Sequence, residues 1–236
     1  MKKIKFPSEA NFFADLILQR TGPFIELGGG AVLNNWFSNG NKNGLVEFLL
    51  TNNIVDEYLH LLFRDLKPEI EELRNNISNE KFEKIVSVGP GNGLIELLIL
   101  DQGLTSEILL IDIERSDEHY HGFNPKGSGY ANLSMTQKFL EENIDRDVKI
   151  ILCNPLREAI PEFKFTLFIS LLSMGFHYPC NDYVNFITDN SESNSIVVID
   201  KRRDVPDSGY DGLKIMFPPV FSIASKKSDR VFLSKA

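Results

Sequence analysis

The fold is decided by residues 84–93, KIVSVGPGNG, in which a short apolar run leads into glycines at alternate positions, Gly89, Gly91 and Gly93. The residues that follow, LIELLILDQ, have the apolar pattern of a helix. Glycine has no Cβ, so a strand that enters a helix through such a turn can bring its backbone close to a bound ligand. We therefore expect this turn to form the floor of a nucleotide-type pocket.

The composition is typical of a folded protein with a sizeable core. Of the 236 residues, 42% are hydrophobic and 25% are charged, and the net charge is −8 at pH 7. An acidic protein repels polyphosphate partners unless it carries a segregated basic surface, and its basic run at 201–203 is typical of a solvated loop. Nucleic acid is therefore not an expected partner.

The cysteines and the N-terminus indicate a soluble cytoplasmic protein. Cys153 and Cys180 form no spaced framework for disulfides or zinc, which indicates a reducing compartment. The N-terminal residues, MKKIKFPSEANFF, lack the apolar core of a secretory signal, and no run approaches the roughly 20 apolar residues of a membrane span. We expect no membrane association.

Residues 1–80 are expected to form a helical cap, and residues 81–236 a cofactor-binding domain. Apolar side chains recur at helical spacing within the cap, in residues 12–17, 45–49 and 58–63. The glycine triplet at 28–30 lacks a strand before it and a lysine after it, so it is predicted to be a turn or a helix cap and not a phosphate loop.

From residue 84 onward, apolar runs alternate with helix-sized segments, which is the pattern of a parallel sheet covered on both faces. Strands are expected near 84–88, 107–112, 148–152, 165–171 and 195–199. Helices are expected at 94–102, 131–143 and 180–189. The end of the chain, KIMFPPVFSIAS and DRVFLSKA joined by KKSD, is typical of an antiparallel hairpin. The predicted fold class is therefore α/β.

Residues 84–236 resemble the class I S-adenosylmethionine-dependent methyltransferases, in the order of their elements as well as in one motif. The glycine loop of that family, GxGxG, reads GPGNG here, and its acidic residue at the end of the second strand is matched by Asp112. The spacing from Gly93 to Asp112 fits one helix and one strand. The resemblance implies a Rossmann-like, mostly parallel seven-stranded sheet with a C-terminal antiparallel hairpin, and S-adenosylmethionine as the cofactor.

The resemblance also implies which residues hold the cofactor. In the family the glycine loop lies against the methionine part, and the acidic residue accepts both ribose hydroxyl protons. The implied cofactor-binding residues are Ser87, Gly89, Pro90, Gly91, Asn92, Gly93, Asp112, Ile113, Cys153, Asn154, Ser170 and Leu171.

Three positions depart from the family pattern. Ser87 stands where many members have an acidic residue near the ammonium group of the cofactor, and Thr166 stands where many have an aspartate. Asn154 replaces an aspartate that often contacts adenine, although asparagine can still accept that hydrogen bond through its side-chain oxygen. These departures fit either neutral drift or an altered cofactor affinity.

A nicotinamide-dependent enzyme is the main alternative for a strand, a glycine-rich turn and a helix. Its fingerprint, GxGxxG, requires a third glycine where this chain has Leu94. With leucine in place of that glycine, the helix cannot pack as closely against the strand as the nicotinamide fold requires. The methyltransferase interpretation is therefore favoured.

The segment SLLSMGFHYP at 170–179 follows the fourth expected strand, where the resemblance places groups that face the methyl group and its acceptor. A histidine with an unperturbed pKa of about 6.5 can take a hydroxyl proton as the oxygen attacks, so His177 is the candidate catalytic base. Its neighbours Phe176 and Tyr178 are candidate acceptor-binding residues.

The long connection at 114–133 is expected to contact the cofactor or the acceptor, because loops of this length are more often functional than not. Tyr120 and His121 are its candidate acceptor-binding residues. His119 and His121 lie two residues apart, and the residues around them complete no metal pattern. No metal site is expected.

The acceptor is predicted to be a small hydroxylated molecule, such as a sugar. Members of the family that methylate bases often carry Asn-Pro-Pro-aromatic after the fourth strand, and this chain has MGFHYP there. An aromatic-rich cap suits an enclosed small acceptor, and a hydroxyl gives His177 a proton to remove. We therefore expect O-methylation of a small molecule.

Two alternatives stay open. The departures at Ser87, Asn154 and Thr166 would suit a protein of the same fold that binds S-adenosylmethionine without catalysing a reaction. A nicotinamide-dependent enzyme is the other. The sequence carries no signal for an oligomeric state.

Overall fold

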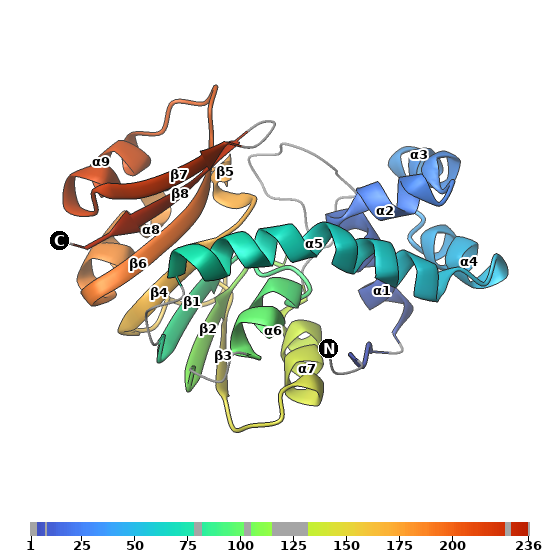
Figure 1. Ribbon diagram of the computed structural model, residues 1–236, viewed down its shortest axis with the longest axis horizontal. Helices are drawn as coiled ribbons and strands as arrows, with labels where there is room; N and C mark the ends of the chain where they lie inside the picture. The colour runs from blue at the N-terminus through green and yellow to red at the C-terminus, as the bar shows by residue number, and fades with distance from the viewer. Residues whose placement is uncertain are drawn as a thin grey trace.

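The computed structural model describes residues 4–7, 9–77, 82–101, 105–114, 132–224 and 228–235. Figure 1 shows a group of N-terminal helices on one side and a twisted sheet with its own helices on the other. The long helix α5 (Val55–Ile77) starts among the N-terminal helices and runs across the front of the sheet, so it connects the two parts.

The N-terminal part is helical, as the sequence predicts. Besides α5 it contains α1 (Ala10–Gln19), α2 (Thr21–Glu26), α3 (Gly30–Asn39) and α4 (Asn43–Thr51). Gly28 has a φ of 87° after the end of α2, and Gly30 begins α3. The glycine triplet therefore forms the predicted turn between two helices.

The sheet contains seven strands in the order β3-β2-β1-β4-β6-β8-β7. Their bounds are β1 (Lys84–Val88), β2 (Glu107–Ile111), β3 (Lys149–Cys153), β4 (Phe165–Ser170), β6 (Ser191–Arg202), β7 (Pro219–Ala224) and β8 (Ser228–Ser234). The first five strands in this set pair in parallel, and β8 pairs antiparallel with both β6 and β7. The predicted mostly parallel, seven-stranded sheet with a C-terminal antiparallel hairpin is confirmed.

Helices cover both faces of the sheet. Ile85 of β1 packs in the cluster formed with α5, α6 (Leu94–Leu100) and α7 (Leu133–Asn143), whereas Val86 and Val88 pack in the cluster formed with α8 (Asn181–Asn190) and α9 (Ser208–Met216). Successive residues of a strand point to opposite faces, so a strand buried on both faces is apolar at nearly every position. This explains the apolar runs in the sequence.

Two elements were not predicted from the sequence. The segment SMGFHY forms a short strand, β5 (Ser173–Tyr178), and the expectation that Lys214–Met216 begins the terminal hairpin is wrong, because these residues end α9. The side chain of Asp207 accepts a hydrogen bond of 3.1 Å from the backbone of Tyr210 and so caps the start of α9. The cap at Asp207 therefore starts a helix, although the residues that follow it favour a strand.

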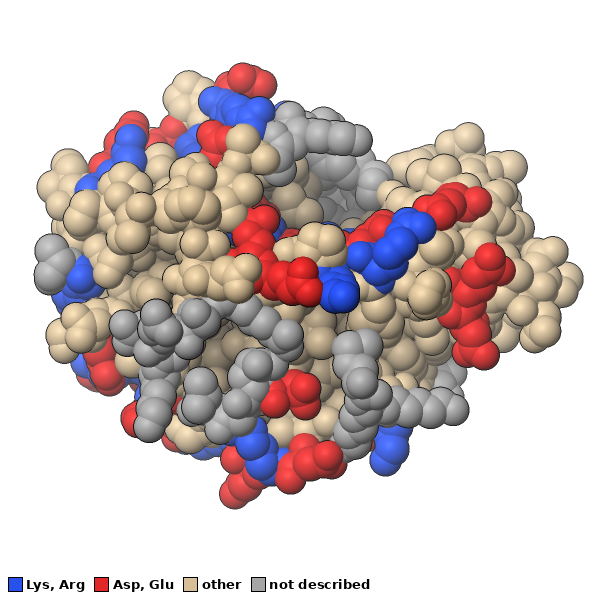
Figure 2. Space-filling view, in the orientation of Figure 1, with Lys and Arg blue, Asp and Glu red and all other residues tan. Residues whose placement is uncertain are grey.

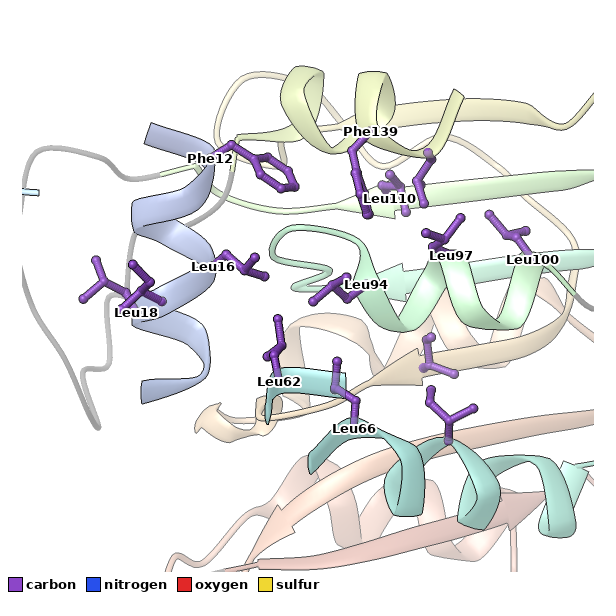
Figure 3. Close-up of a cluster of buried hydrophobic side chains, with 14 of the residues drawn as sticks. Phe12, Leu16, Leu18, Leu62, Leu66, Leu94, Leu97, Leu100, Leu110 and Phe139 are labelled. Atoms are coloured by element: carbon purple, nitrogen blue, oxygen red, sulfur yellow. The ribbon is translucent and has the colours of Figure 1, made fainter. Parts of the chain in front are cut away.

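One hydrophobic core joins the N-terminal helices to the sheet. Figure 3 shows α1 lying across the end of the sheet, with Leu16 directed toward Leu94 of α6 and Phe12 toward Phe139 of α7. The two phenyl rings lie 5.2 Å apart, and all four side chains are buried. Since one cluster contains residues of α1, α5, α6, α7 and the strands, α1 is held firmly over the carboxyl ends of β1 and β2.

A chain of buried ion pairs also fastens α5 to the sheet. Arg230 of β8 donates to Asp200 of β6 at 2.8 Å and to Glu69 of α5 at 2.7 Å, and the second oxygen of Glu69 lies 2.9 Å from Arg20 at the end of α1. The Arg230 side chain is only 11% exposed and Asp200 only 3%. In Figure 2, acidic and basic side chains gather along the middle of the face where α5 runs.

We predict that Arg230→Met lowers the free energy of unfolding by about 3–5 kcal/mol, because it leaves the buried carboxylate of Asp200 without its cation and leaves Glu69 with Arg20 alone. Arg64→Met is the matched control: Arg64 pairs with Glu26, both side chains are about half exposed, and its loss should cost less than about 1 kcal/mol. Urea unfolding followed by circular dichroism measures both. Equal losses in the two variants would contradict this account of the ion pairs.

Candidate functional site

The register of the sheet brings the ends of three strands to one edge. Val88 pairs with Ile111 and Ile111 with Cys153, so the residues that follow, Gly89, Asp112 and Asn154, lie side by side. Two hydrogen bonds continue the pairing past the strands: the N–H of Gly89 donates to Ile111 at 2.8 Å, and that of Asp112 donates to Cys153 at 3.2 Å. The predicted glycine loop and the predicted acidic residue are therefore neighbours. This edge is where parallel α/β sheets bind ligands.

The glycine loop has the backbone geometry that its glycines predict. Gly89, Gly91 and Gly93 have φ values of 70°, 57° and 76°, all in the left-handed region that other residues avoid. The N–H of Gly93 donates to Pro90 at 3.0 Å, which closes the turn, and the carbonyl of Gly93 accepts the first helical bond of α6 from Leu97 at 2.8 Å. The loop thus passes from strand to helix in five residues.

Helices on two sides hold the loop in place. The Asn92 side chain is buried and donates to the carbonyl of Phe12 in α1 at 2.9 Å, while the Gln19 side chain accepts from the N–H of Asn92 at 3.2 Å. On the other side, the hydroxyl of Thr136 in α7 donates to the carbonyl of Gly91 at 2.6 Å. A Cβ on Gly91 would lie 2.4–2.6 Å from the amide end of the Gln19 side chain, so any other residue here would require that side chain to move.

Asp112 is partly buried at the end of β2. One of its oxygens accepts from the N–H of Glu114 at 2.9 Å. Burial, together with the negative charge of Glu114, raises the pKa of Asp112 to about 6, although hydrogen bonds from the backbone of Glu114 and Ile113 oppose this rise. The carboxyl group is therefore ionised at neutral pH but sits close to its titration range.

Asn154 is tied to the loop after β2. Its side-chain amide donates to the carbonyl of Ile113 and to the carboxylate of Glu114, both at 3.2 Å. Its side-chain oxygen accepts from the N–H of Leu156 at 3.0 Å, and this oxygen has a second lone pair for another donor. The same Glu114 accepts from the N–H of Leu133 at the start of α7 at 2.8 Å, so it links β2, β3 and α7.

A cavity of about 420 Å³ opens beside these residues. It is lined by Glu114, Asn132, Leu133, Ser134, Leu152, Asn154, Arg157 and Glu158. Its volume lies within the range of small-molecule sites, and its lining is mostly polar. The cavity lies between Leu152 and Asn154 at the end of β3 and the start of α7.

Three predicted cofactor-binding residues have side chains that are hydrogen-bonded or buried within the protein itself. The Ser170 hydroxyl donates to Val88 at 3.0 Å and accepts from Met174 at 2.9 Å, while that of Ser87 donates to Glu96 at 2.6 Å. The Cys153 thiol is buried, and burial raises its pKa to about 11, so it stays protonated at neutral pH. A contact of any of these side chains with a cofactor stays a prediction.

His177 lies on β5, which follows β4 through Leu171 and Leu172. Its ring is partly buried and meets the edge of Phe176 at 5.0 Å between centroids. The N–H of Leu172 donates to Asp200 at 3.1 Å, which connects this segment to the buried ion pairs. Tyr120 and His121 lie outside the described residues, and the structure describes only the backbone of Tyr178.

Within the described part of the chain, no group of three or more His, Cys, Asp or Glu side chains is arranged to hold a metal ion. Nor does any helix among those residues combine the length and the apolar character needed to cross a membrane.

Three residues at this site were not predicted from the sequence. Gln19 and Arg20, at the end of α1, reach the loop and the ion pairs, and Glu96 of α6 is buried next to Ser87. Glu96 had a signal of its own, because it is the only charged residue in the apolar helix LIELLIL. No residue pattern in the sequence indicates the contact of Gln19 in α1 with Asn92 in the loop, 73 residues later.

No family model and no curated protein matches this chain. Solved structures do resemble it. The PH0226 protein of Pyrococcus horikoshii matches 74% of this chain and 91% of its own, with a TM-score of 0.51 at 12% identity. The N-methyltransferase NodS of Bradyrhizobium japonicum, solved with S-adenosylhomocysteine, matches 73% of this chain and 86% of its own, with a TM-score of 0.51 at 9% identity.

These similarities concern the fold. Together with the strand order, they show that the chain has the Rossmann-like fold of the class I methyltransferases, as the resemblance in the sequence implied.

We predict that Gly93→Ala destabilises the protein by about 1 kcal/mol more than Gly28→Ala. Both residues have positive φ, so each variant carries the left-handed cost of about 1–2 kcal/mol. A Cβ on Gly93 would in addition lie 2.8 Å from a methyl group of Thr136, whereas one on Gly28 would meet nothing within 4 Å. Thermal unfolding of both variants measures the difference, and a Gly93→Ala variant as stable as Gly28→Ala would refute the tight packing of α7 on the loop.

Proposed function

We propose that this protein is an S-adenosylmethionine-dependent methyltransferase that methylates a hydroxyl group of a small acceptor. The observation that carries the proposal is the register of β1 and β2, which sets the left-handed glycine loop beside Asp112 at the ligand-binding edge of the sheet. When bound, S-adenosylmethionine would supply a methyl group on a positively charged sulfur, which an oxygen nucleophile can attack. NodS, which has the same fold, binds the demethylated form of this cofactor.

The residues at the site fit this cofactor. A carboxylate offers about four acceptor positions, and the backbone of Glu114 and Ile113 uses two on Asp112, so capacity remains for two ribose hydroxyls. The free lone pair of the Asn154 oxygen can accept from an adenine amino group. The neighbouring cavity of about 420 Å³ provides room on that side.

Calorimetric titration with S-adenosylhomocysteine tests the cofactor assignment and its dependence on pH. Ribose hydroxyls donate to the ionised carboxylate, and the pKa of Asp112 is about 6. Affinity should therefore be constant above pH 7 and fall about tenfold per pH unit below pH 6, where the protonated form predominates.

Asp112→Asn should weaken binding by about 1–3 kcal/mol at pH 7.5 and remove this pH dependence. Asp147→Asn, at an exposed position before β3, is the control and should behave as the unaltered protein. A protein that binds NAD and not S-adenosylhomocysteine would replace this proposal by the nicotinamide-dependent alternative.

The proposed small hydroxylated acceptor rests on two features, the position of His177 and the negative net charge of the protein. A neutral imidazole can take the proton of an acceptor hydroxyl as its oxygen attacks the methyl carbon. His177 stands on the segment after β4, at the same edge of the sheet as the glycine loop, and Leu172 of this segment is held by Asp200. A net charge of −8, with basic side chains lying beside acidic ones on the face in Figure 2, favours a small acceptor over a nucleic acid.

We predict that His177→Asn lowers the rate of methyl transfer by about 10²–10⁴-fold without changing affinity for S-adenosylhomocysteine, because it removes a base and no cofactor contact. A panel of monosaccharides and small phenols serves as acceptors, and release of S-adenosylhomocysteine is the readout. His60→Asn, at an exposed position of α5, is the control. An unchanged rate in His177→Asn would remove this residue from catalysis.

A protein that binds the cofactor without catalysis is the second candidate. It is favoured by the departures from the family pattern at Ser87, Asn154 and Thr166. Tight binding of S-adenosylhomocysteine with no methyl transfer to any acceptor of the panel would support this candidate over the enzyme.

A further inference from the structure

Two residues at the candidate site have a backbone conformation that their side chains disfavour. Among the described residues, the non-glycine residues with positive φ are Asn53, Glu114, Leu172 and Asn194. Asparagine adopts this left-handed conformation comparatively easily, whereas glutamate and leucine rarely do. Glu114 and Leu172 stand just past the carboxyl ends of β2 and β4, at the edge of the sheet that carries the glycine loop. Strain that gathers at one edge in this way indicates a functional role.

The left-handed conformation of Leu172 is held by Asp200 of β6. The N–H of Leu172, whose φ is 55°, donates to Oδ2 of Asp200 at 3.1 Å. Asp200 is itself fixed, because Arg230 donates to its Oδ1 at 2.8 Å and to its Oδ2 at 3.0 Å. Only 3% of the Asp200 side chain is exposed. A carboxylate this deeply buried acts on a ligand only through the backbone that it holds.

The turn between β4 and β5 is also tied to the strand that leads into the glycine loop. The hydroxyl of Ser170 donates to the carbonyl of Val88 at 3.0 Å and accepts from the N–H of Met174 at 2.9 Å, so it links β1, β4 and β5. Gly175 has a φ of 79°, and a Cβ there would lie 3.4 Å from the carbonyl oxygen of Asp200. The backbone after β4 is therefore fixed by β1 on one side and by β6 on the other.

We propose that Asp200 is a positioning residue of the cofactor edge, which holds Leu172 in its left-handed conformation and so fixes the turn between β4 and β5. This inference rests on the proposed function. The turn carries Leu171, a predicted cofactor-binding residue, and leads on to His177, the predicted base. Methyl transfer requires the acceptor oxygen, the methyl carbon and the sulfur to lie in line, so a shift of about 1 Å in this turn would slow the reaction.

Substitutions at Leu172 separate this role from the ion pair of Asp200 with Arg230. Asp200→Ala removes both contacts of the carboxylate, and Arg230 keeps Glu69 as a partner at 2.7 Å, so the variant is expected to fold. Glycine adopts the left-handed conformation without being held, whereas alanine does not. Leu172→Gly added to Asp200→Ala should therefore restore the turn. Leu172→Ala in the same background also removes the leucine side chain but should not restore it.

Two measurements follow the turn and the site separately. Amide hydrogen exchange at Met174, whose N–H is bonded to Ser170, reports on the turn. Calorimetric titration with S-adenosylhomocysteine reports on the site. Asp200→Ala should speed this exchange and weaken this affinity by about tenfold each, the factor for losing one hydrogen bond to a charged group. Leu172→Gly should recover most of both losses, and Leu172→Ala should recover neither.

Asn194→Gly in the Asp200→Ala background is the matched control, because it replaces an exposed left-handed residue near the start of β6, at the opposite edge of the sheet. It should recover neither loss. Asp200→Leu, which fills the space of the carboxylate, replaces Asp200→Ala if the latter does not fold.

Three results would overturn the positioning role while the cofactor assignment stands. Exchange at Met174 unchanged by the loss of Asp200 would show that Asp200 does not hold the turn. Faster exchange with unaltered affinity would show that the turn does not position the site, and equal recovery by glycine and alanine at position 172 would show that the left-handed conformation is not what matters. If the unaltered protein does not bind S-adenosylhomocysteine, the proposed function fails and the positioning role fails with it.

Discussion

The structure depends on the packing of α1 against the turn between β1 and α6. The turn requires three left-handed residues, and the only side chain among positions 91–93, that of Asn92, is turned inward onto α1. The covering helix in turn places Gln19 where the Cβ of any other residue at position 91 would be. At position 91 glycine is favoured by its left-handed backbone, and it also leaves room for the Gln19 side chain. The same contact decides where Arg20 lies.

The buried ion pairs extend this arrangement across the molecule. From Arg20 they lead through Glu69 of α5 and Arg230 of β8 to Asp200, which holds the backbone after β4. Charged groups this well buried are kept only when each has a partner of opposite sign. The glycine loop and the segment leading to His177, which lie at this edge of the sheet, are thus held by one connected set of contacts. The N-terminal helices serve as part of the site's frame.

The sequence predicted the elements whose signals are local. Apolar runs predicted β1 to β4, and the alternate glycines predicted the loop. The spacing to Asp112 predicted that it lies at the neighbouring strand end, because strand order and register follow once a parallel sheet is assumed. The residue pattern did not predict the secondary structure where a tertiary contact or a helix cap determines it. The strand β5 contains Gly175 at a φ of 79°, close to Asp200 and Lys201 of β6, and α9 depends on the cap at Asp207. Glu96 stands out in the sequence as the one acidic residue of an apolar helix, but its hydrogen bond with Ser87 is a tertiary contact that the residue pattern does not show.

The central claim is that one edge of the sheet holds S-adenosylmethionine, with its ribose at Asp112 and its amino-acid end at the glycine loop. A crystal structure of the full chain with S-adenosylhomocysteine tests this most directly. The account predicts both ribose hydroxyls within hydrogen-bonding distance of the Asp112 carboxylate and the amino-acid end of the ligand against the glycine loop. A ligand bound elsewhere, or one bound in reverse with its adenine against the glycine loop, would contradict it.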